Sequence, residues 1–379
     1  MSLTIGVDVG GTKVAAGAVD DQGRIVEKLR LSTPSASPEQ TAAVIADAAA
    51  DLLSRHKATS VGVGAAGFVN ESAGTVAFAP NLAWRKEPLR AKVEGMIGLP
   101  VVVENDGNAS AWAEVKFGAA RGHAHVVYIS VGTGIGAGFI LDGRLYRGRW
   151  GMAAEPGHFR VVPDGRLCGC GNRGCWEQYA SGNALTTEAR DFARRSPSGA
   201  TRLLQLAGGD PDGIGGAQVT QAALEGDPAA LRCFGIVGSW LGQGMADLAA
   251  ILDPGCFVIG GGVSEAGELL IGSARAAFEK GLTGGHYRPQ VHITRAALGP
   301  DAGIVGAADL ARRAVSSPLA SSSPTGLRRS VFPLASGRLL TRLLPSSLLR
   351  RAWAGSAGTN TVQSAAAPSG SQDPGSQDP

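Results

Sequence analysis

The segment from Glu155 to Gly182 constrains this chain most, because it gathers three cysteines and a histidine between two glutamates. Three thiolates and one imidazole form the complete tetrahedral ligand set of a structural zinc site, with no position left open for water. The predicted zinc ligands are His158, Cys168, Cys170 and Cys175. The glycines expected to supply the tight turns between them are Gly169, Gly171 and Gly174. Free thiols or a disulfide are the alternative, although free cysteines usually behave as buried hydrophobes and seldom crowd a polar turn.

Length and cysteine usage limit the class of protein. A chain of 379 residues with 44% hydrophobic residues can bury a large core and suggests two domains. The remaining two of its five cysteines, Cys233 and Cys256, lie in apolar surroundings, which favours core thiols and a reducing cytoplasm. The amino terminus enters a strand pattern without a basic leader, and no uncharged apolar run is as long as a membrane span. We therefore expect a cytoplasmic protein without membrane contact.

Charge is unevenly distributed along the chain. Of the formal net charge of +3, six arginines and two aspartates give residues 316–379 a charge of +4, so residues 1–315 carry −1. A nearly neutral body lacks the basic face that nucleic-acid binding requires, and we expect no nucleic-acid partner. The serine- and proline-rich stretch 316–379 is predicted to be a disordered, dispensable tail. A frame-shifted extension and an amphipathic membrane helix around Leu339–Leu349 are the alternatives.

A glycine turn follows the first predicted strand, Leu3–Val9. Two further strands, ending near Val19 and Leu31, would complete an antiparallel meander, followed by a helix from Pro38 to about His56. Backbone N–H groups at such a turn can approach phosphate oxygens, while a hydroxyl and an ammonium add donors. An isolated pattern of this kind more often marks an ordinary hairpin. The turn candidates are Asp8, Gly10, Gly11, Thr12 and Lys13.

Asp106 follows a predicted apolar strand, Leu99–Val103, and precedes a helix predicted from Ala109. Ligand sites of α/β proteins gather at the carboxyl ends of strands, which would place this carboxylate at the mouth of a cleft. An aspartate at this place can equally be a helix cap. The residues alone leave both interpretations open.

Two further glycine clusters follow strands in the second half. The strand Val126–Val131 leads through residues 132–138 into another strand, which excludes a dinucleotide fingerprint and suggests a second phosphate hairpin in a related half of the protein. The third cluster, at 260–262, stands between the strand Cys256–Ile259 and a helix from about Glu265, where an adenine ring could lie against bare backbone. Helices at 229–252 and 301–315 and a strand at 291–294 complete the predicted body.

Together these motifs resemble the ROK family of sugar kinases and regulators. The resemblance covers residues 1 to about 315 and is carried by DVGGTK at 8–13, ENDGNA at 104–109, GTGIGAG at 132–138, EPGH at 155–158, CGCGNRGCWE at 168–177 and GGG at 260–262. It implies an α/β, actin-like (ribonuclease H-like) two-domain sugar kinase fold with the active site in the inter-domain cleft. The small domain would span 1–110, completed by 301–315, and the large domain 111–300.

Within this family the chain is most similar to the bacterial enzymes that act on glucose. The resemblance therefore implies ATP-dependent phosphorylation of glucose to glucose 6-phosphate with Mg²⁺, by a homodimer or homotetramer. A kinase for another hexose such as N-acetylmannosamine is one alternative. A sugar-binding regulator without turnover is another, although the family's repressors place a helix-turn-helix before the kinase-like body and here the first hairpin begins within ten residues of Met1.

The resemblance also implies roles for individual residues. Asp106 would be the catalytic base, and Asp8 would hold Mg²⁺ through its water shell. Phosphates would be bound by Gly10, Gly11, Thr12, Lys13, Gly132, Thr133 and Gly134, and adenosine by Gly261 and Gly262. The sugar would be bound by Gly67, Asn81, Asn105, Asp106, Glu155, His158 and Glu177, so that His158 serves zinc and sugar with different nitrogens. Relatives commonly carry proline before the glycine that corresponds to Gly67, where this chain has Ala66.

Overall fold

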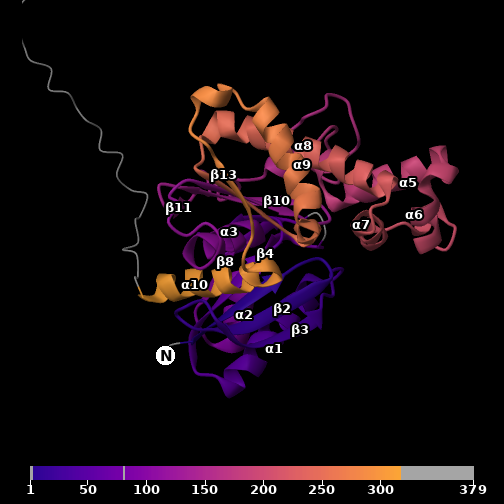
Figure 1. The fold of residues 1–379 in the computed structure, drawn as a ribbon. Coiled ribbons are helices and arrows are strands. Elements are labelled where there is room, and N and C mark those ends of the chain that lie inside the picture. Colours follow the sequence, from indigo (N-terminus) through magenta and orange to yellow (C-terminus); the bar gives the residue numbers. More distant parts are fainter. Residues whose placement is uncertain (1–2, 80–81, 317–379) are drawn as a thin grey trace, which may run out of the picture. The chain divides into compact units, whose positions relative to one another are not determined.

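The computed structural model describes residues 3–79 and 82–316 (Figure 1). The described residues form one compact unit. The predicted tail and the predicted sugar ligand Asn81 lie outside the described residues, so the expectations about them stay predictions.

The first sheet has five strands in the order β3-β2-β1-β4-β8. The predicted meander is confirmed, because β1 pairs antiparallel with β2 and β2 with β3, while β4 joins β1 and β8 joins β4 in parallel. Glycine and polar turns separate the hairpin strands, and apolar residues fill the centre of the sheet. The strands are β1 (Leu3–Val9), β2 (Lys13–Val19), β3 (Ile25–Ser32), β4 (Ala58–Ala65) and β8 (Val101–Asn105).

Helices connect and cover this sheet. Ser37 caps α1 (Pro38–Arg55) by accepting a hydrogen bond from the Gln40 N–H, and Pro38 occupies the first turn, where its missing N–H costs nothing. A small three-stranded sheet lies between β4 and β8 in the chain. The remaining elements here are β5 (Phe68–Asn70), β6 (Thr75–Phe78), β7 (Arg85–Glu87), α2 (Leu89–Ile97) and α3 (Asp106–Lys116).

The second sheet repeats the strand order of the first. Its order is β11-β10-β9-β12-β13, with antiparallel pairing of β9, β10 and β11 and parallel addition of β12 and β13. If the five strands of each sheet are numbered in chain order, both sheets have the order 3-2-1-4-5. This shared order is expected of two related halves. The strands are β9 (Val126–Val131), β10 (Ile135–Leu141), β11 (Arg144–Leu145), β12 (Cys256–Gly260) and β13 (His292–Arg295).

A helical layer packs on the second sheet around buried Trp176, Phe234 and Phe257. Sequence analysis did not predict the helix α7 (Gly216–Leu224), which precedes α8 (Pro228–Leu252) in the chain. Of the described helices, α8 alone is long and apolar enough to span a membrane by length and composition, and half of its most apolar window is buried in the protein. The helices are α4 (Glu177–Ala180), α5 (Gly182–Arg195), α6 (Thr201–Leu206), α7 (Gly216–Leu224), α8 (Pro228–Leu252) and α9 (Glu268–Gly281). Short 3₁₀ turns occupy η1 (Pro156–His158), η2 (Pro197–Ala200), η3 (Pro211–Gly213), η4 (Gly262–Ala266), η5 (Gly285–Tyr287) and η6 (Gly299–Asp301).

The last described helix, α10 (Ala302–Ser316), returns to the first sheet and packs on β1, β4 and α3 (Figure 1). Glycines make this contact unusually close. A Cβ atom at Gly6 would lie 2.0 Å from the Ile304 carbonyl oxygen, and one at Gly306 would lie 1.8 Å from the Ala109 carbonyl oxygen. Helix α10 thereby holds α3, whose first residue is Asp106, against the first sheet.

Candidate active site

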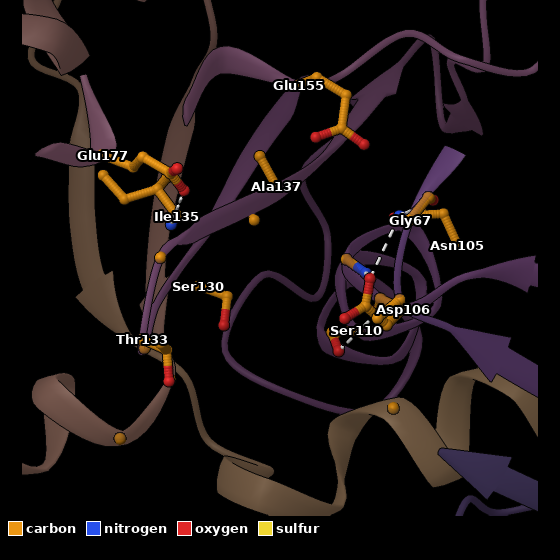
Figure 2. A pocket seen from close by; sticks show the side chains of 18 of the residues that line it. Gly67, Asn105, Asp106, Ser110, Ser130, Thr133, Ile135, Ala137, Glu155 and Glu177 are labelled. Atoms are coloured by element: carbon orange, nitrogen blue, oxygen red, sulfur yellow. Dashed lines mark hydrogen bonds between the residues drawn. The ribbon is translucent and has the colours of Figure 1, made fainter. Parts of the chain in front are cut away.

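A cavity of about 760 Å³ collects most of the predicted site residues (Figure 2). It lies where the two glycine hairpins, the start of α3, the cysteine segment and the third glycine cluster meet. The predicted residues that line it are Asp8, Lys13, Gly67, Asn105, Asp106, Gly132, Thr133, Gly134, Glu155, His158, Cys170, Glu177, Gly261 and Gly262. The other predicted residues within the described part of the chain are not part of this lining; they are Gly10, Gly11, Thr12, Cys168 and Cys175.

The start of α3 determines how Asp106 is presented. The helix begins at Asp106 rather than at Ala109, and its cap is Asn105, whose Oδ1 accepts a hydrogen bond of 2.9 Å from the Asn108 N–H. The capping interpretation of Asp106 is therefore wrong. The Asn105 side-chain amide also donates to the Gly67 carbonyl at 3.0 Å and to Asp106 Oδ1 at 3.1 Å, which ties the Gly67 turn to the carboxylate (Figure 2).

Asp106 keeps one carboxylate oxygen unbonded. Oδ1 accepts from the Asn105 amide and from the Gly107 N–H at 3.0 Å, while no described residue donates to Oδ2. Burial raises the pKa of Asp106, against the lowering effect of the Gly107 hydrogen bond. A carboxylate with a raised pKa and an open oxygen is a stronger proton acceptor than a solvated one.

The first hairpin presents charge to the cavity rather than bare backbone. The Gly10 N–H donates to the Lys13 carbonyl at 3.0 Å and is used within the turn, whereas the side chains of Asp8 and Lys13 line the cavity. The pKa of Asp8 is raised to about 7, mainly by burial and also by the charge of Asp106, against the lowering effect of Lys13. Gly303 of α10 lies against this carboxylate, since a Cβ there would be 2.8 Å from Asp8 Cγ.

The second hairpin presents a neutral side chain to the cavity, and Glu177 packs against it. The Gly132 N–H donates to the Gly134 carbonyl at 3.0 Å, and the Thr133 side chain lines the cavity (Figure 2). A Cβ at Gly134 would lie 2.4 Å from Glu177 Oε2, so glycine leaves the space that the carboxylate occupies. The same Glu177 oxygen accepts a hydrogen bond of 3.4 Å from the Ile135 N–H.

The predicted zinc ligands converge on one point. Their four donor atoms all lie within 4.8 Å of one another, with Cys168 Sγ at 3.7 Å from His158 Nδ1 and Cys170 Sγ at 3.6 Å from Cys175 Sγ. Around a tetrahedral zinc ion with Zn–S bonds of about 2.3 Å, such atoms stand about 3.5–3.8 Å apart, so the set fits the ion. All five cysteines are within the described residues and none forms a disulfide.

All three glycines lie in turns of this segment, and two of them have a backbone that favours glycine. Gly171 and Gly174 have φ values of 93° and 77°, in the left-handed region. A Cβ at Gly174 would also lie 1.6 Å from the Val162 carbonyl oxygen. Gly169 lies in the turn that the Gly171 N–H closes on the Cys168 carbonyl at 3.0 Å, but its φ is not positive and its Cβ position is open, so the turn does not require glycine there.

Carboxylates surround the cavity next to this cluster. Glu177 Oε1 lies 3.0 Å from Cys168 Sγ and 3.8 Å from His158 Nδ1, so His158 directs Nδ1 to the cluster and leaves Nε2 for the cavity that it lines. The pKa of Glu155 is raised to about 8, mainly by burial and also by the charges of Asp106 and Glu177. Such a lining suits a ligand with many hydroxyl donors.

The third glycine cluster has two functions in the structure. Gly261 has a φ of 82° and lies against β9, since a Cβ there would be 2.5 Å from the Val131 carbonyl oxygen. Gly262 has open space at its Cβ position and lines the cavity. This arrangement leaves a flat backbone surface where a nucleoside can lie.

Sequence reasoning missed several polar residues at the site. Arg147 donates to Glu104 at 2.7 Å, and Glu104, which is 1% exposed, also accepts from the Asn105 N–H next to the candidate base. The cavity lining also includes Ser110, Tyr128 and Ser130. Ser110 could have been predicted from the sequence, because it follows Asp106 by one helical turn and therefore lies on the same face of α3.

Comparison with known proteins places this architecture in a family. The model of the ROK family matches residues 4–314. A glucokinase of Streptomyces coelicolor is 51% identical over 312 residues, which cover 82% of this chain and 98% of that protein. A xylose repressor of Caldicellulosiruptor bescii is 32% identical over 236 residues, 62% of this chain and 58% of the repressor.

A solved structure gives the same result. The crystal structure of a ROK family glucokinase from Streptomyces griseus in complex with glucose and AMPPNP aligns with a TM-score of 0.78 and 52% identity, covering 82% of this chain and all of that one. The likeness confirms the predicted actin-like α/β fold, while the predicted domain boundaries stay predictions. The chain belongs to the ROK family.

Proposed function

We propose that the protein transfers the γ-phosphate of ATP to the 6-hydroxyl of glucose, giving glucose 6-phosphate and ADP. The observation that carries the proposal is the open oxygen of Asp106 in one cavity with both glycine hairpins and the carboxylate-rich wall. The relatives named glucokinase support the substrate, and the solved relative with glucose and AMPPNP supports the pair of ligands.

The transfer requires one proton acceptor and a positioned phosphate. The 6-hydroxyl oxygen attacks the γ-phosphorus and forms a new P–O bond, while the bond to the β-phosphate oxygen breaks and ADP leaves with its electron pair. The hydroxyl proton moves to Asp106 Oδ2. Asn105 and the Gly107 N–H hold Oδ1, so the second oxygen is directed at the sugar.

Phosphate binding divides between the hairpins. Lys13 supplies a positive charge and Thr133 a hydroxyl donor. The backbone of Gly10, Gly11, Thr12, Gly132 and Gly134 is predicted to contribute to phosphate binding. The described charged groups of the cavity are mostly carboxyl groups, which would repel ATP unless a cation intervenes. Asp8 would hold Mg²⁺ through its water shell, and the bound cation would offset this repulsion.

The sugar lies on the other side of the cavity. Glu155, Glu177 and His158 Nε2 bind sugar hydroxyls together with Asn105 and the Gly67 turn; Asn81 is predicted to join them. A zinc ion would be held by His158, Cys168, Cys170 and Cys175, and its contribution is to order the segment between Glu155 and Glu177. Gly261 and Gly262 face the adenosine.

Substitution of the base tests the assignment. Asp106→Asn keeps the shape and the hydrogen bond from the Gly107 N–H but takes up a proton poorly. We expect kcat to fall by about two to four decades, while glucose and ATP binding, measured by calorimetry, stays within about threefold of wild type. A near wild-type rate of ADP release from the Asn variant would remove Asp106 from the base role.

Two other functions are distinguished by a sugar panel. ADP release measured with glucose, mannose and N-acetylmannosamine is expected to be most efficient with glucose. A preference for N-acetylmannosamine would identify a kinase for another hexose, and glucose binding without ADP release would identify a sugar-responsive regulator, a class represented among the relatives by the xylose repressor. A cytoplasmic homo-oligomer without nucleic-acid or membrane contacts stays a prediction.

A further inference from the structure

Three hydroxyl groups that no motif predicted form a continuous group in the wall of the cavity. Ser110 of α3 and Tyr128 and Ser130 of β9 all line it, and both serine side chains lie beside the Tyr128 hydroxyl. Ser130 and Tyr128 stand two positions apart on one strand and therefore share a face of the sheet. Figure 2 shows Ser130 between Thr133 of the second hairpin and Ser110 beside Asp106. The group thus spans the route from the ATP phosphates to the proposed base.

One of the three hydroxyl hydrogens has a defined acceptor. Ser110 donates its hydrogen to the Asp106 carbonyl at 2.9 Å, so toward other groups its oxygen can only accept. Tyr128 is 3% exposed, and its hydroxyl lies beside both serines. Ser130 can donate its hydrogen to a ligand in the cavity while its oxygen accepts from a neighbour, because a serine hydroxyl accepts and donates at the same time.

The position of Tyr128 is fixed by the third glycine cluster. A Cβ at Gly260 would lie 2.4 Å from the Tyr128 hydroxyl oxygen, so this glycine makes room for the phenol rather than for adenosine. Burial raises the pKa of Tyr128, which keeps the phenol protonated and neutral. A neutral donor suits this place, because the described cavity is already lined by Asp8, Asp106, Glu155, Glu177 and Glu265.

On the basis of the proposed function, we infer that Ser130 donates a hydrogen bond to the γ-phosphoryl group during its transfer, and that Tyr128 and Ser110 orient this donor. The charge on the equatorial phosphoryl oxygens must be met by donors all along the route between ATP and the sugar. Thr133 and Lys13 would bind the phosphates of ATP. The Ser130 hydroxyl lies between Thr133 and Asp106 (Figure 2). Ser130 is thus a catalytic residue, whereas Tyr128 is a positioning residue.

The test compares Ser130→Ala with Ser130→Thr in the full-length protein. We expect Ser130→Ala to lower kcat by about 10- to 100-fold, to leave glucose affinity unchanged within about twofold, and to weaken inhibition by ADP with aluminium fluoride by the same factor as kcat. Ser130→Thr keeps the hydroxyl and is expected to retain most of the rate. Tyr128→Phe should lower kcat by a smaller factor, about three- to tenfold, without changing the Km for glucose.

The outcomes separate this assignment from the function itself. Wild-type ADP release with glucose is measured first, and its absence would overturn the proposed function. If the wild type turns over and Ser130→Ala does so at an equal rate, the donor role of Ser130 is wrong. If Ser130→Thr loses as much activity as Ser130→Ala, the loss reflects packing, and the assignment is equally overturned.

Discussion

The two sheets have the same strand order, yet their first hairpins present different chemistry to the cavity. The β1–β2 hairpin contributes the charged side chains of Asp8 and Lys13, whereas the β9–β10 hairpin contributes the neutral Thr133, with Ser130 just before it. The repeated topology explains why both hairpins face one cavity. Under the proposed function, this difference predicts a division of work, in which the first half would bind the cation and the charged phosphates and the second half would supply neutral donors.

The halves differ further in the segments inserted after each hairpin. In the second half the chain between β11 and α4 carries Glu155 and the cysteine cluster, and Glu177 is the first residue of α4. The first half instead has the three-stranded sheet β5–β7 between β4 and β8. Glu177 connects the cluster to the second hairpin through its hydrogen bond from the Ile135 N–H. Substitutions in each half can therefore separate the contributions of the two halves.

Among the tests that compare the two halves, the largest effect is expected from disruption of the cysteine–histidine cluster, which among the described residues exists in the second half alone. Cys170→Ser removes one ligand, so bound zinc should fall to a small fraction of one equivalent in elemental analysis. Because Glu155 and Glu177 flank this segment, we expect kcat/Km for glucose to fall by about 100-fold, with changes in both kcat and Km. Cys233→Ser, at a buried thiol outside the cluster, is the matched control. Full activity of a zinc-free Cys170→Ser protein would refute the structural role of the metal.

The next prediction compares the hairpins directly. Lys13→Met removes a charged donor worth about 1.5–3 kcal/mol, so the Km for ATP should rise by about 10- to 100-fold. Thr133→Val removes a neutral hydroxyl worth about 0.5–1.5 kcal/mol, and the same Km should rise by only about two- to tenfold. Both are read from initial rates at saturating glucose. Equal effects, or a larger effect at Thr133, would contradict the division of work between the halves.

The smallest effect concerns the pH dependence of glucose binding. The pKa of Glu155 is raised to about 8, so this carboxyl is largely protonated at pH 7 in the free protein. Sugar hydroxyls donate to the charged form and favour it, so binding should release a proton and glucose affinity should fall, by at most about tenfold per pH unit, as pH decreases below 8. Calorimetry without nucleotide, repeated in buffers of different ionisation enthalpy, measures both quantities. Glu155→Gln should abolish the proton release, and an unchanged release in that variant would assign it to another group.

Sequence reasoning predicted the elements that local patterns encode. The meander, the two related halves and the cysteine cluster were accessible, because strand periodicity, glycine turns and metal-ligand spacing are properties of short segments. The start of α3 was misplaced because Asn105 and Asp106 are both good cap residues, and only the backbone shows that Asn105 holds the Asn108 N–H. The spatial group of Ser110, Tyr128 and Ser130 was not accessible, because it depends on β9 packing against α3. From the sequence, Gly260 resembled part of a nucleotide-binding motif. In the structure the Tyr128 side chain of the neighbouring strand β9 occupies the space that a side chain at Gly260 would need.

The most direct test of the proposed reaction uses the unmodified protein. Glucose and Mg-ATP are incubated with the enzyme, and ³¹P NMR follows the γ-phosphate signal, the ADP signals and any new phosphomonoester. The proposal predicts one glucose 6-phosphate for each ADP, and no ADP above a slow background when glucose is omitted. Glucose binding by calorimetry together with no new phosphomonoester, or ADP formation that yields only inorganic phosphate, would contradict the transfer.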